Sequence, residues 1–371
     1  MKRIFVWAVG MCAVCGTVSA QLTLEECYRA ARENYPLVRQ FDLIERTKDF
    51  TVENAAKGYF PQLSFSGKAS YQSDVTKMPF SIPGVEFGLD NDQYQLVLEL
   101  NQTVWDGGVV RNRKEEARAK SDVQKGQLEV NLYALNDRVN QLFFGMLLID
   151  AQLAQNALLQ AQLARNHGQV SACMQQGVAN QADLDAVKVE QLNTKQKRVE
   201  LVSSRMAYLK MLSLLVGEKL SQETVLEKPV PQDDISAVGE IRRPELSLFN
   251  AQGVGLQVQE KALNVRHLPQ FGLFVQGAYG NPGLNMLKNE FSPYYIAGVR
   301  LSWNFGSLYT LKNDRKVIEN KRRQLDNNRD VFLFNTRLEM TQQDQAIQSL
   351  EKQMQDDDEI IRLRTNIRKS A

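Results

Sequence analysis

Four segments of the chain alternate between apolar and polar residues with a period of two, which predicts β-strands with two different faces. The segments are 63–71, 95–101, 271–279 and 295–303. Strands of roughly ten residues that are apolar on one side and carry aromatic residues at their ends are typical of membrane β-barrels. A soluble antiparallel sheet shows the same alternation, so the pattern alone leaves both structures open.

Long amphipathic helices are the second pattern, and no proline interrupts residues 84–228. Apolar residues in this stretch recur at steps of three and four, as in the seam of a coiled coil. Gly177 is suited to end one helix and Asn180 to cap the next, so we expect a helical hairpin over residues 108–216. The expected seam residues are Leu132, Leu135, Val139, Leu142, Met146, Ile149 and Leu153 on the first arm, and Val199, Val202, Met206 and Leu209 on the second.

An internal repeat organises the chain. Pro36 and Pro61 recur as Pro244 and Pro269 at an offset of 208 residues, and the segment 104–108 resembles 302–306 at an offset of 198. Such self-similarity indicates that one structural unit is used twice. In each unit we expect helices, then two strands, then a long helix, the shorter helices covering 24–35, 38–59 and 245–267. The expected divisions are 1–20 for a signal peptide, 21–217 for the first repeat, 218–243 for a linker and 244–371 for the second repeat.

The repeat also predicts where strands meet helices. Two glycines where a strand gives way to a helix more often serve backbone geometry than a ligand. The expected strand–helix junction residues are Pro61, Asp106, Gly107 and Gly108 in the first repeat, and Pro269, Asn304 and Gly306 in the second.

The N-terminus has the features of a secretory signal peptide. Lys2 and Arg3 precede a short apolar run, and Val18-Ser19-Ala20 forms a cleavage site before Gln21. Cys12 and Cys15 leave a lipoprotein as an alternative, although neither lies in a good lipid-attachment context. Beyond this segment we find no apolar run long enough for a membrane helix, so an exported chain of this kind is either soluble or a β-barrel.

Charge and cysteine content exclude some functions. The net charge is +2 and there is no basic tract, which argues against nucleic acid as a partner. Cys27 and Cys173 can pair in an oxidising compartment, but nothing in their spacing indicates it, and two free cysteines are the simpler interpretation.

We expect no enzyme activity, metal or cofactor. His167 and His267 are far apart and lack metal-like spacing, and there is neither a glycine-rich phosphate loop nor a nucleophile motif. The carboxylates of residues 356–359 are either a cation site or, as we prefer, a solvated helix face.

Strand number predicts an assembly. Four strands cannot close a barrel, an open edge is forbidden in lipid, and the smallest membrane barrels need about eight strands. Several copies must therefore pool their strands, and the helices that continue from them form a ring one layer thick. We expect an α+β membrane protein with long antiparallel helical hairpins and a shared β-barrel, which together make a conduit.

Three segments of the chain resemble a known family, the TolC-like outer-membrane efflux proteins. The resemblance covers nearly the whole chain after the signal peptide, and rests on the opening segment 22–36, the junction 105–108 and the turn 177–184. It implies a homotrimer in the Gram-negative outer membrane, with a twelve-stranded barrel and a periplasmic α-barrel formed by the helical hairpins.

The resemblance also implies partners. A periplasmic membrane-fusion adaptor and an inner-membrane pump or secretion ATPase complete such systems, and the helical tip carries the adaptor contacts. The implied adaptor-docking residues are Gly177, Val178, Ala179, Asn180, Gln181, Ala182, Asp183 and Leu184.

Within the barrel the alternation predicts which side chains meet lipid and which meet the lumen. We expect Lys68, Glu99 and Arg300 to face the lumen. Trp105 and Trp303 each end a strand before a long helix and are expected at the periplasmic interface, whereas Tyr71, Tyr94, Tyr279 and Tyr295 are expected at the opposite rim. The loops near 73–92 and 281–293 are then expected outside the cell.

The chain stops at Ala371, before the second hairpin's turn that the repeat places near residue 375, so it resembles a truncated member of the family. The alternative function, from a different class, is an exported periplasmic coiled-coil scaffold or adaptor with a small soluble sheet.

Overall fold

The computed structural model describes residues 22–75, 90–230, 241–286 and 288–370. The predicted signal peptide, with its two cysteines, lies outside the described residues, as do most of the predicted loop 73–92 and residues 231–240 of the predicted linker.

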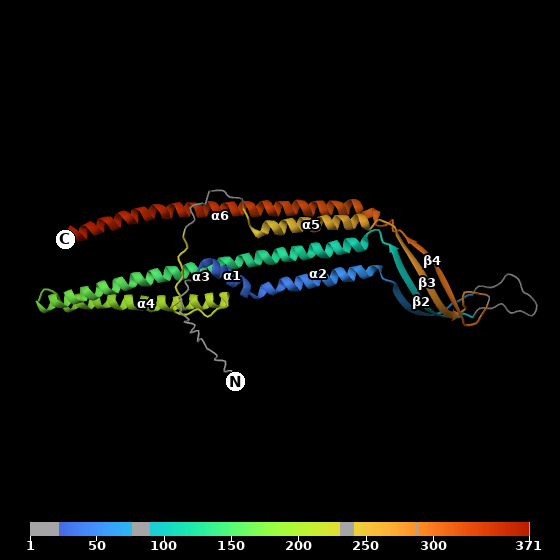
Figure 1. Cartoon of the computed structure of the whole chain (residues 1–371), viewed down its shortest axis with the longest axis horizontal. Helices are drawn as coiled ribbons and strands as arrows, with labels where there is room; N and C mark the ends of the chain where they lie inside the picture. Colours follow the sequence, from blue (N-terminus) through green and yellow to red (C-terminus); the bar gives the residue numbers. More distant parts are fainter. Residues whose placement is uncertain (1–21, 76–89, 231–240, 287, 371) are drawn as a thin grey trace, which may run out of the picture. The chain divides into compact units, whose positions relative to one another are not determined.

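Four antiparallel strands form one sheet in the order β1-β2-β3-β4 (Figure 1). The strands are β1 (Gln62–Tyr71), β2 (Asp92–Trp105), β3 (Gln270–Asn281) and β4 (Ser292–Ser302). All four lie where the alternation predicts. Residues of one face also lie opposite one another across the sheet. Phe65, for example, is opposite Leu98, and Leu98 is opposite Gly277.

The predicted helical hairpin is confirmed as α3 (Val109–Gln175) and α4 (Gln181–Val216). Gly177 has a positive φ of 75°, which glycine adopts without strain, so the chain can leave α3 sharply. Asn180 caps α4 as predicted. Its side chain accepts a hydrogen bond from the Asp183 backbone N–H at 3.0 Å, and the Asp183 carboxylate accepts one from the Asn180 N–H at 2.9 Å.

The described residues divide into two compact units, the first comprising 22–41, 128–230 and 241. Its core joins α1 (Leu24–Asn34) to α3 and α4, with Cys27 of α1, Phe143 of α3 and Leu212 of α4 fully buried. The predicted seam is right at Val139 and Met146. Both cysteines of the described chain are free, Cys27 buried and Cys173 exposed.

The predicted seam on α4 is partly wrong. Val199 and Val202 are 61% and 44% exposed, and the buried apolar residues are Leu201, Leu209, Leu212 and Val216. Apolar residues occur on two faces of α4, so the three-and-four spacing fits more than one register. Packing against α1 and α3 selects the face that holds Leu212.

The second unit comprises the described residues of 42–127 and 242–370. It contains the sheet, most of α2 (Gln40–Ala56), the start of α3, α5 (Pro244–Val265) and α6 (Leu308–Ser370). The short 3-10 helices η1 (Pro36–Arg39) and η2 (Lys57–Tyr59) flank α2. Helices α5 and α6 lie side by side (Figure 1), joined by an ion pair of 2.6 Å between Glu260 and Arg322. The domain boundaries predicted from the internal repeat do not coincide with these two compact units, and they stay a prediction.

Among the described residues one helix, α3, meets the length and composition of a membrane span, a match that the sequence analysis did not anticipate. α3 contains an 18-residue stretch that is mostly apolar. The core of the first unit accounts for several of the apolar residues of α3, because Val139, Phe143 and Met146 pack against the other helices there.

Candidate functional site

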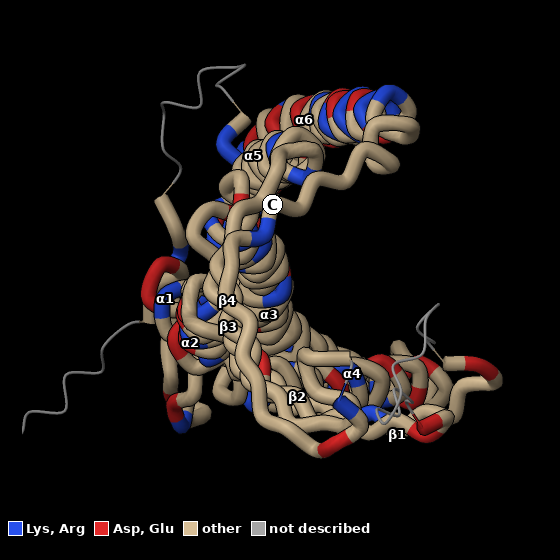
Figure 2. The backbone as a smooth tube through the Cα atoms, turned by 90° about the vertical axis from the view of Figure 1, so that its right-hand side faces the viewer, with Lys and Arg blue, Asp and Glu red and all other residues tan. Residues whose placement is uncertain are grey.

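The two faces of the sheet differ in chemistry. Leu96, Leu98 and Leu100 lie on one face and are exposed, whereas Val97 and Glu99 on the other face are half-buried. This is the reverse of a soluble sheet, in which the apolar face is covered. Strand charges are scarce (Figure 2): apart from Asp92 at the start of β2, they are Lys68, Glu99 and Arg300. An exposed apolar face of this extent needs an apolar medium or partner.

The polar face brings two of its three predicted residues together. Arg300 donates to the Glu99 carboxylate at 3.0 Å and to Asn101 Oδ1 at 3.2 Å. It reaches β2 from β4 across β3 because Gly272, its partner in the register, has no side chain in the way. The guanidinium also lies 4.8 Å from the centre of the Phe274 ring. Lys68 belongs to the same face and forms no ion pair with a described residue.

Aromatic residues occupy both ends of the sheet, as predicted. At the helix end, Trp105 lies 5.7 Å from Phe271 and Trp303 lies 4.7 Å from Phe305, between ring centres. At the other end, Phe291 stacks on Tyr279 at 5.7 Å, and Tyr71 is 77% exposed. Tyr and Trp in this arrangement are suited to the two interfaces of a membrane. Their depth in a membrane stays a prediction.

The first strand–helix junction is built around Asp106, which is buried. Its carboxylate accepts hydrogen bonds from Gly108 N at 2.8 Å, Val110 N at 2.6 Å and the Tyr59 hydroxyl at 2.7 Å. Burial alone would raise the pKa of Asp106, but these hydrogen bonds outweigh it and hold the pKa below its ordinary value. The charged carboxylate therefore caps the start of α3.

The glycines of this junction have a steric role. Gly107 and Gly108 have φ values of 68° and 93°, which other residues rarely adopt. A Cβ on Gly107 would also lie 2.7 Å from the Cβ of Leu268, closer than two carbons can pack. The junction pair thus serves backbone geometry, as the sequence indicates.

The second junction repeats this design with neutral groups. Asn304 Oδ1 accepts from Gly306 N at 2.9 Å, and the Trp303 indole donates to the His267 carbonyl at 3.0 Å. The His267 ring lies 2.7 Å from Ser307 Oγ through Nδ1. Sequence analysis missed the roles of Tyr59 and His267, although the offset of 208 residues aligns them with each other.

The predicted docking residues form the turn between α3 and α4 and the first turn of α4, and most of them are exposed. Val178 is 78% exposed, and its backbone N–H donates to the Cys173 carbonyl at 2.9 Å. Gln181 donates to Asp185 at 2.9 Å, which stabilises the first turn of α4. These hydrogen bonds define the backbone of the turn, and the exposed Val178 gives it a small apolar tip, a combination suited to binding a protein.

No group of three or more His, Cys, Asp or Glu side chains with the geometry of a metal site occurs among the described residues. The run 356–359 lies exposed along α6, where basic and acidic residues are interleaved (Figure 2).

Comparison with known proteins decides the family. The family model described as outer membrane efflux protein matches residues 27–218, more than half of the chain. The chain belongs to the outer membrane efflux protein family. None of the curated proteins matches it in sequence.

Solved structures of outer-membrane channels share the fold. CusC, whose structures are described in terms of folding and transmembrane channel formation, is 15% identical, with 83% of this chain and 73% of CusC covered and a TM-score of 0.55. The CmeC channel of Campylobacter jejuni is 11% identical, with coverages of 84% and 68% and a TM-score of 0.55. VceC of Vibrio cholerae is 11% identical, with coverages of 81% and 73% and a TM-score of 0.57.

Several predictions are thereby confirmed. This efflux protein is a channel of the outer membrane that extends into the periplasm, it has the TolC-like fold, and it is not an enzyme. Membership in the family decides against the coiled-coil scaffold. Channels of the family are trimeric and work in efflux systems. The roles expected for the tip, the lumen-facing residues and the interface aromatics stay predictions.

Proposed function

We propose that three copies of this efflux protein form one passive duct that exports small molecules, or unfolded polypeptides, across the periplasm and the outer membrane. The observation that carries the proposal is the sheet with an exposed apolar face on all four strands. Phe65, Leu98, Val275 and Val299 belong to this face and are 48–71% exposed. Lipid is the medium that favours such a surface.

The strand count supports three copies. Four strands leave two open edges, and unpaired backbone groups at an edge are costly in lipid. Twelve strands from three chains close a barrel, and family channels are trimers. The apolar face then contacts lipid, and the face with Lys68, Glu99 and Arg300 lines the lumen.

The energy for transport must come from partners. We propose that the turn 177–184 docks a periplasmic membrane-fusion adaptor, which connects the duct to an inner-membrane pump or secretion ATPase. The support is the exposed Val178 on a backbone fixed by the Asn180 cap. An apolar tip of this kind gives specificity through the shape of its contact surface, in the way that charged groups do through their charge.

Carbonate extraction and conductance test the duct. The protein in isolated outer membranes should resist carbonate, migrate as an oligomer under native electrophoresis, and open ion-conducting pores in planar bilayers. A chain that carbonate releases, or an intact oligomer that does not conduct, would refute the duct.

Photocross-linking tests the docking role separately. A benzophenone amino acid at Val178 should cross-link a periplasmic protein in cells, whereas the same group at Leu214 should not. The two positions are a fair comparison because both side chains are nearly fully exposed, at 78% and 77%. Equal cross-linking from both positions would contradict a specific contact at the tip.

A further inference from the structure

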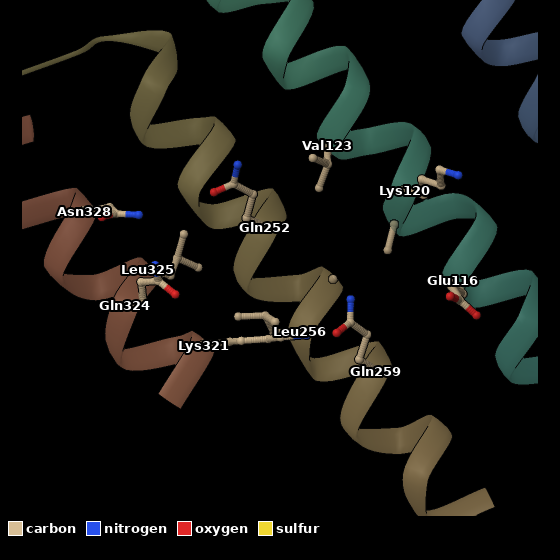
Figure 3. A pocket seen from close by; sticks show the side chains of 12 residues that line it. Glu116, Lys120, Val123, Gln252, Leu256, Gln259, Lys321, Gln324, Leu325 and Asn328 are labelled. Atoms are coloured by element: carbon tan, nitrogen blue, oxygen red, sulfur yellow. The ribbon is translucent and has the colours of Figure 1, made fainter. Parts of the chain in front are cut away.

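An open trough of about 410 Å³ runs between three helices of the second unit (Figure 3). Residues 116–123 of α3, 252–259 of α5 and 321–328 of α6 line it, each helix contributing positions at steps of three and four. Each helix therefore presents one continuous face to the same space. The volume falls in the range of small-molecule sites, about 300–1,000 Å³.

The floor of the trough is apolar. It consists of Ala119 and Val123 of α3, Gly255 and Leu256 of α5, and Leu325 of α6. Ala119 is buried, and a Cβ placed on Gly255 would meet no atom within 4 Å. The absence of a side chain at Gly255 thus leaves open space against the backbone of α5, where a flat apolar body can lie.

Four carboxamides surround this floor, from Gln252, Gln259, Gln324 and Asn328. None of them makes a hydrogen bond with a described residue. Each carries two N–H donors and an acceptor oxygen, so together they form a ring of polar groups available to a ligand.

Three charged side chains also line the trough, Glu116, Lys120 and Lys321, and none forms an ion pair with a described residue. Their neighbours in sequence behave differently. Glu115 pairs with Lys261 at 3.3 Å, and Arg322 pairs with Glu260 at 2.6 Å. Two ammonium groups against one carboxylate give the trough one net positive charge. Lys321 extends from α6 alongside Leu256 of α5 (Figure 3), beside the apolar floor.

We propose that this trough binds an amphipathic organic anion. A rigid apolar body would cover the floor at Gly255 and Leu256, its carboxylate or sulfonate would lie beside Lys321, and the carboxamides would donate to or accept from its remaining polar atoms. The inference goes beyond the proposed function, because the trough can hold such an anion whether or not the duct carries it. Charge complementarity is the argument for an anion over a neutral molecule of the same shape.

A pair of fluorescent probes tests the proposal. 1-Anilinonaphthalene-8-sulfonate carries a sulfonate, and N-phenyl-1-naphthylamine has the same rings without it. Both should be titrated against the full chain in phosphatidylcholine nanodiscs, with empty nanodiscs subtracted. The sulfonate should bind saturably and more tightly than the neutral probe. Equal affinities for the two probes would overturn the proposal of an anion site.

Two variants with matched controls locate the site. Lys321→Gln should weaken the sulfonate about two- to fivefold, as expected for one exposed charge pair, and leave the neutral probe unchanged. Lys316→Gln, which removes an exposed lysine of α6 outside the trough, should change neither. Gly255→Leu fills the floor and should weaken both probes about tenfold, whereas Val254→Leu should not.

The outcomes are separable from failures of folding or of the duct. Native electrophoresis and conductance of each variant report assembly without reference to the probes. If assembled Gly255→Leu or Lys321→Gln protein binds the sulfonate as the wild type does, the trough is not the site. If Gly255→Leu fails to assemble, Lys321→Gln alone decides, because its side chain is exposed and does not support the fold.

Discussion

At the scale of the residue, the two strand–helix junctions show one design carried out with different groups. Asp106 meets three donors, whereas its counterpart Asn304 accepts one backbone hydrogen bond. The repeat reveals which residues correspond, but it cannot reveal the bonds. Tyr59 and Asp106 are 47 residues apart in the chain, and His267 and Ser307 are 40 apart, so only the folded sheet brings them together.

Removing the Asp106 side chain should destabilise the fold more than removing the Asn304 side chain. Asp106→Ala leaves two backbone N–H groups and the Tyr59 hydroxyl without their acceptor, and should lower the free energy of unfolding by about 2 kcal/mol. Asn304→Ala loses one such bond and should cost about 1 kcal/mol or less. Urea unfolding of the two variants in detergent gives the comparison, and equal losses would contradict the role of Asp106.

The carboxylate of Asp106 should also make stability depend on acid. Its pKa is lower in the folded chain than its unfolded value of about 3.9. Its contribution is therefore complete above the unfolded pKa and is lost as pH falls through the folded pKa. Asp106→Asn should reduce the loss of thermal stability in this acid range. A melting temperature that falls with acid equally in both proteins would show that other groups dominate.

The two faces of β2 should respond differently to a charge. Leu98→Arg should cost roughly 2–4 kcal/mol, because position 98 is expected near the middle of the membrane. Glu99→Gln should leave stability nearly intact and alter conductance. Spin labels at the two positions provide a direct check: a water-soluble quencher should reach position 99 and not position 98, and equal access would contradict the assignment of the faces.

At the scale of the element, strands and helix ends could be predicted closely, whereas the packing faces of long helices could not. Alternation identifies the strands because each has a single apolar face, and Gly177 and Asn180 mark a turn by their local chemistry. Helix α4 has apolar residues on two faces, so its spacing fits both Val202 and Leu201. The trough could not be predicted from the sequence either, because the residues that line it depend on the rotation of α3, α5 and α6 about their axes.

Two glycines of α3 offer a test of the hairpin's packing. A Cβ on Gly145 would overlap the Tyr208 ring of α4, whereas one on Gly168 would meet nothing within 4 Å. Gly145→Ala should destabilise the hairpin by about 1–3 kcal/mol through overpacking. Gly168→Ala should stabilise it by roughly 0.5–1 kcal/mol, since alanine favours a helix. Thermal unfolding followed by circular dichroism distinguishes them, and shifts of the same sign would be evidence against this packing.

At the scale of the whole molecule, the chain order of strands and helices gives the topology of insertion. β1 ends at Tyr71 next to the start of β2 at Asp92, and β3 ends at Asn281 near the start of β4 at Ser292; these strand ends lie away from the long helices. If the helices occupy the periplasm, the connections between these strand ends are outside the cell.

Protease added to intact cells should therefore cut within 72–91 or 282–291 and leave α3 intact. Permeabilised cells provide the control, because the protease then reaches the periplasmic helices as well. Cleavage near Gln160 in intact cells, with both connections spared, would reverse the topology.

Because α3 is one continuous helix, its continuity limits how the length of the helical hairpin can change. Its 67 residues contribute to both compact units, so an insertion rotates one end of the helix against the other unless it preserves the seam. Seven residues are the smallest addition that returns a coiled-coil face to its place, and they lengthen a helix by about 10 Å. Paired additions to α3 and α4 would move the turn at Val178 in steps of this size, so the length of the hairpin would change in discrete increments.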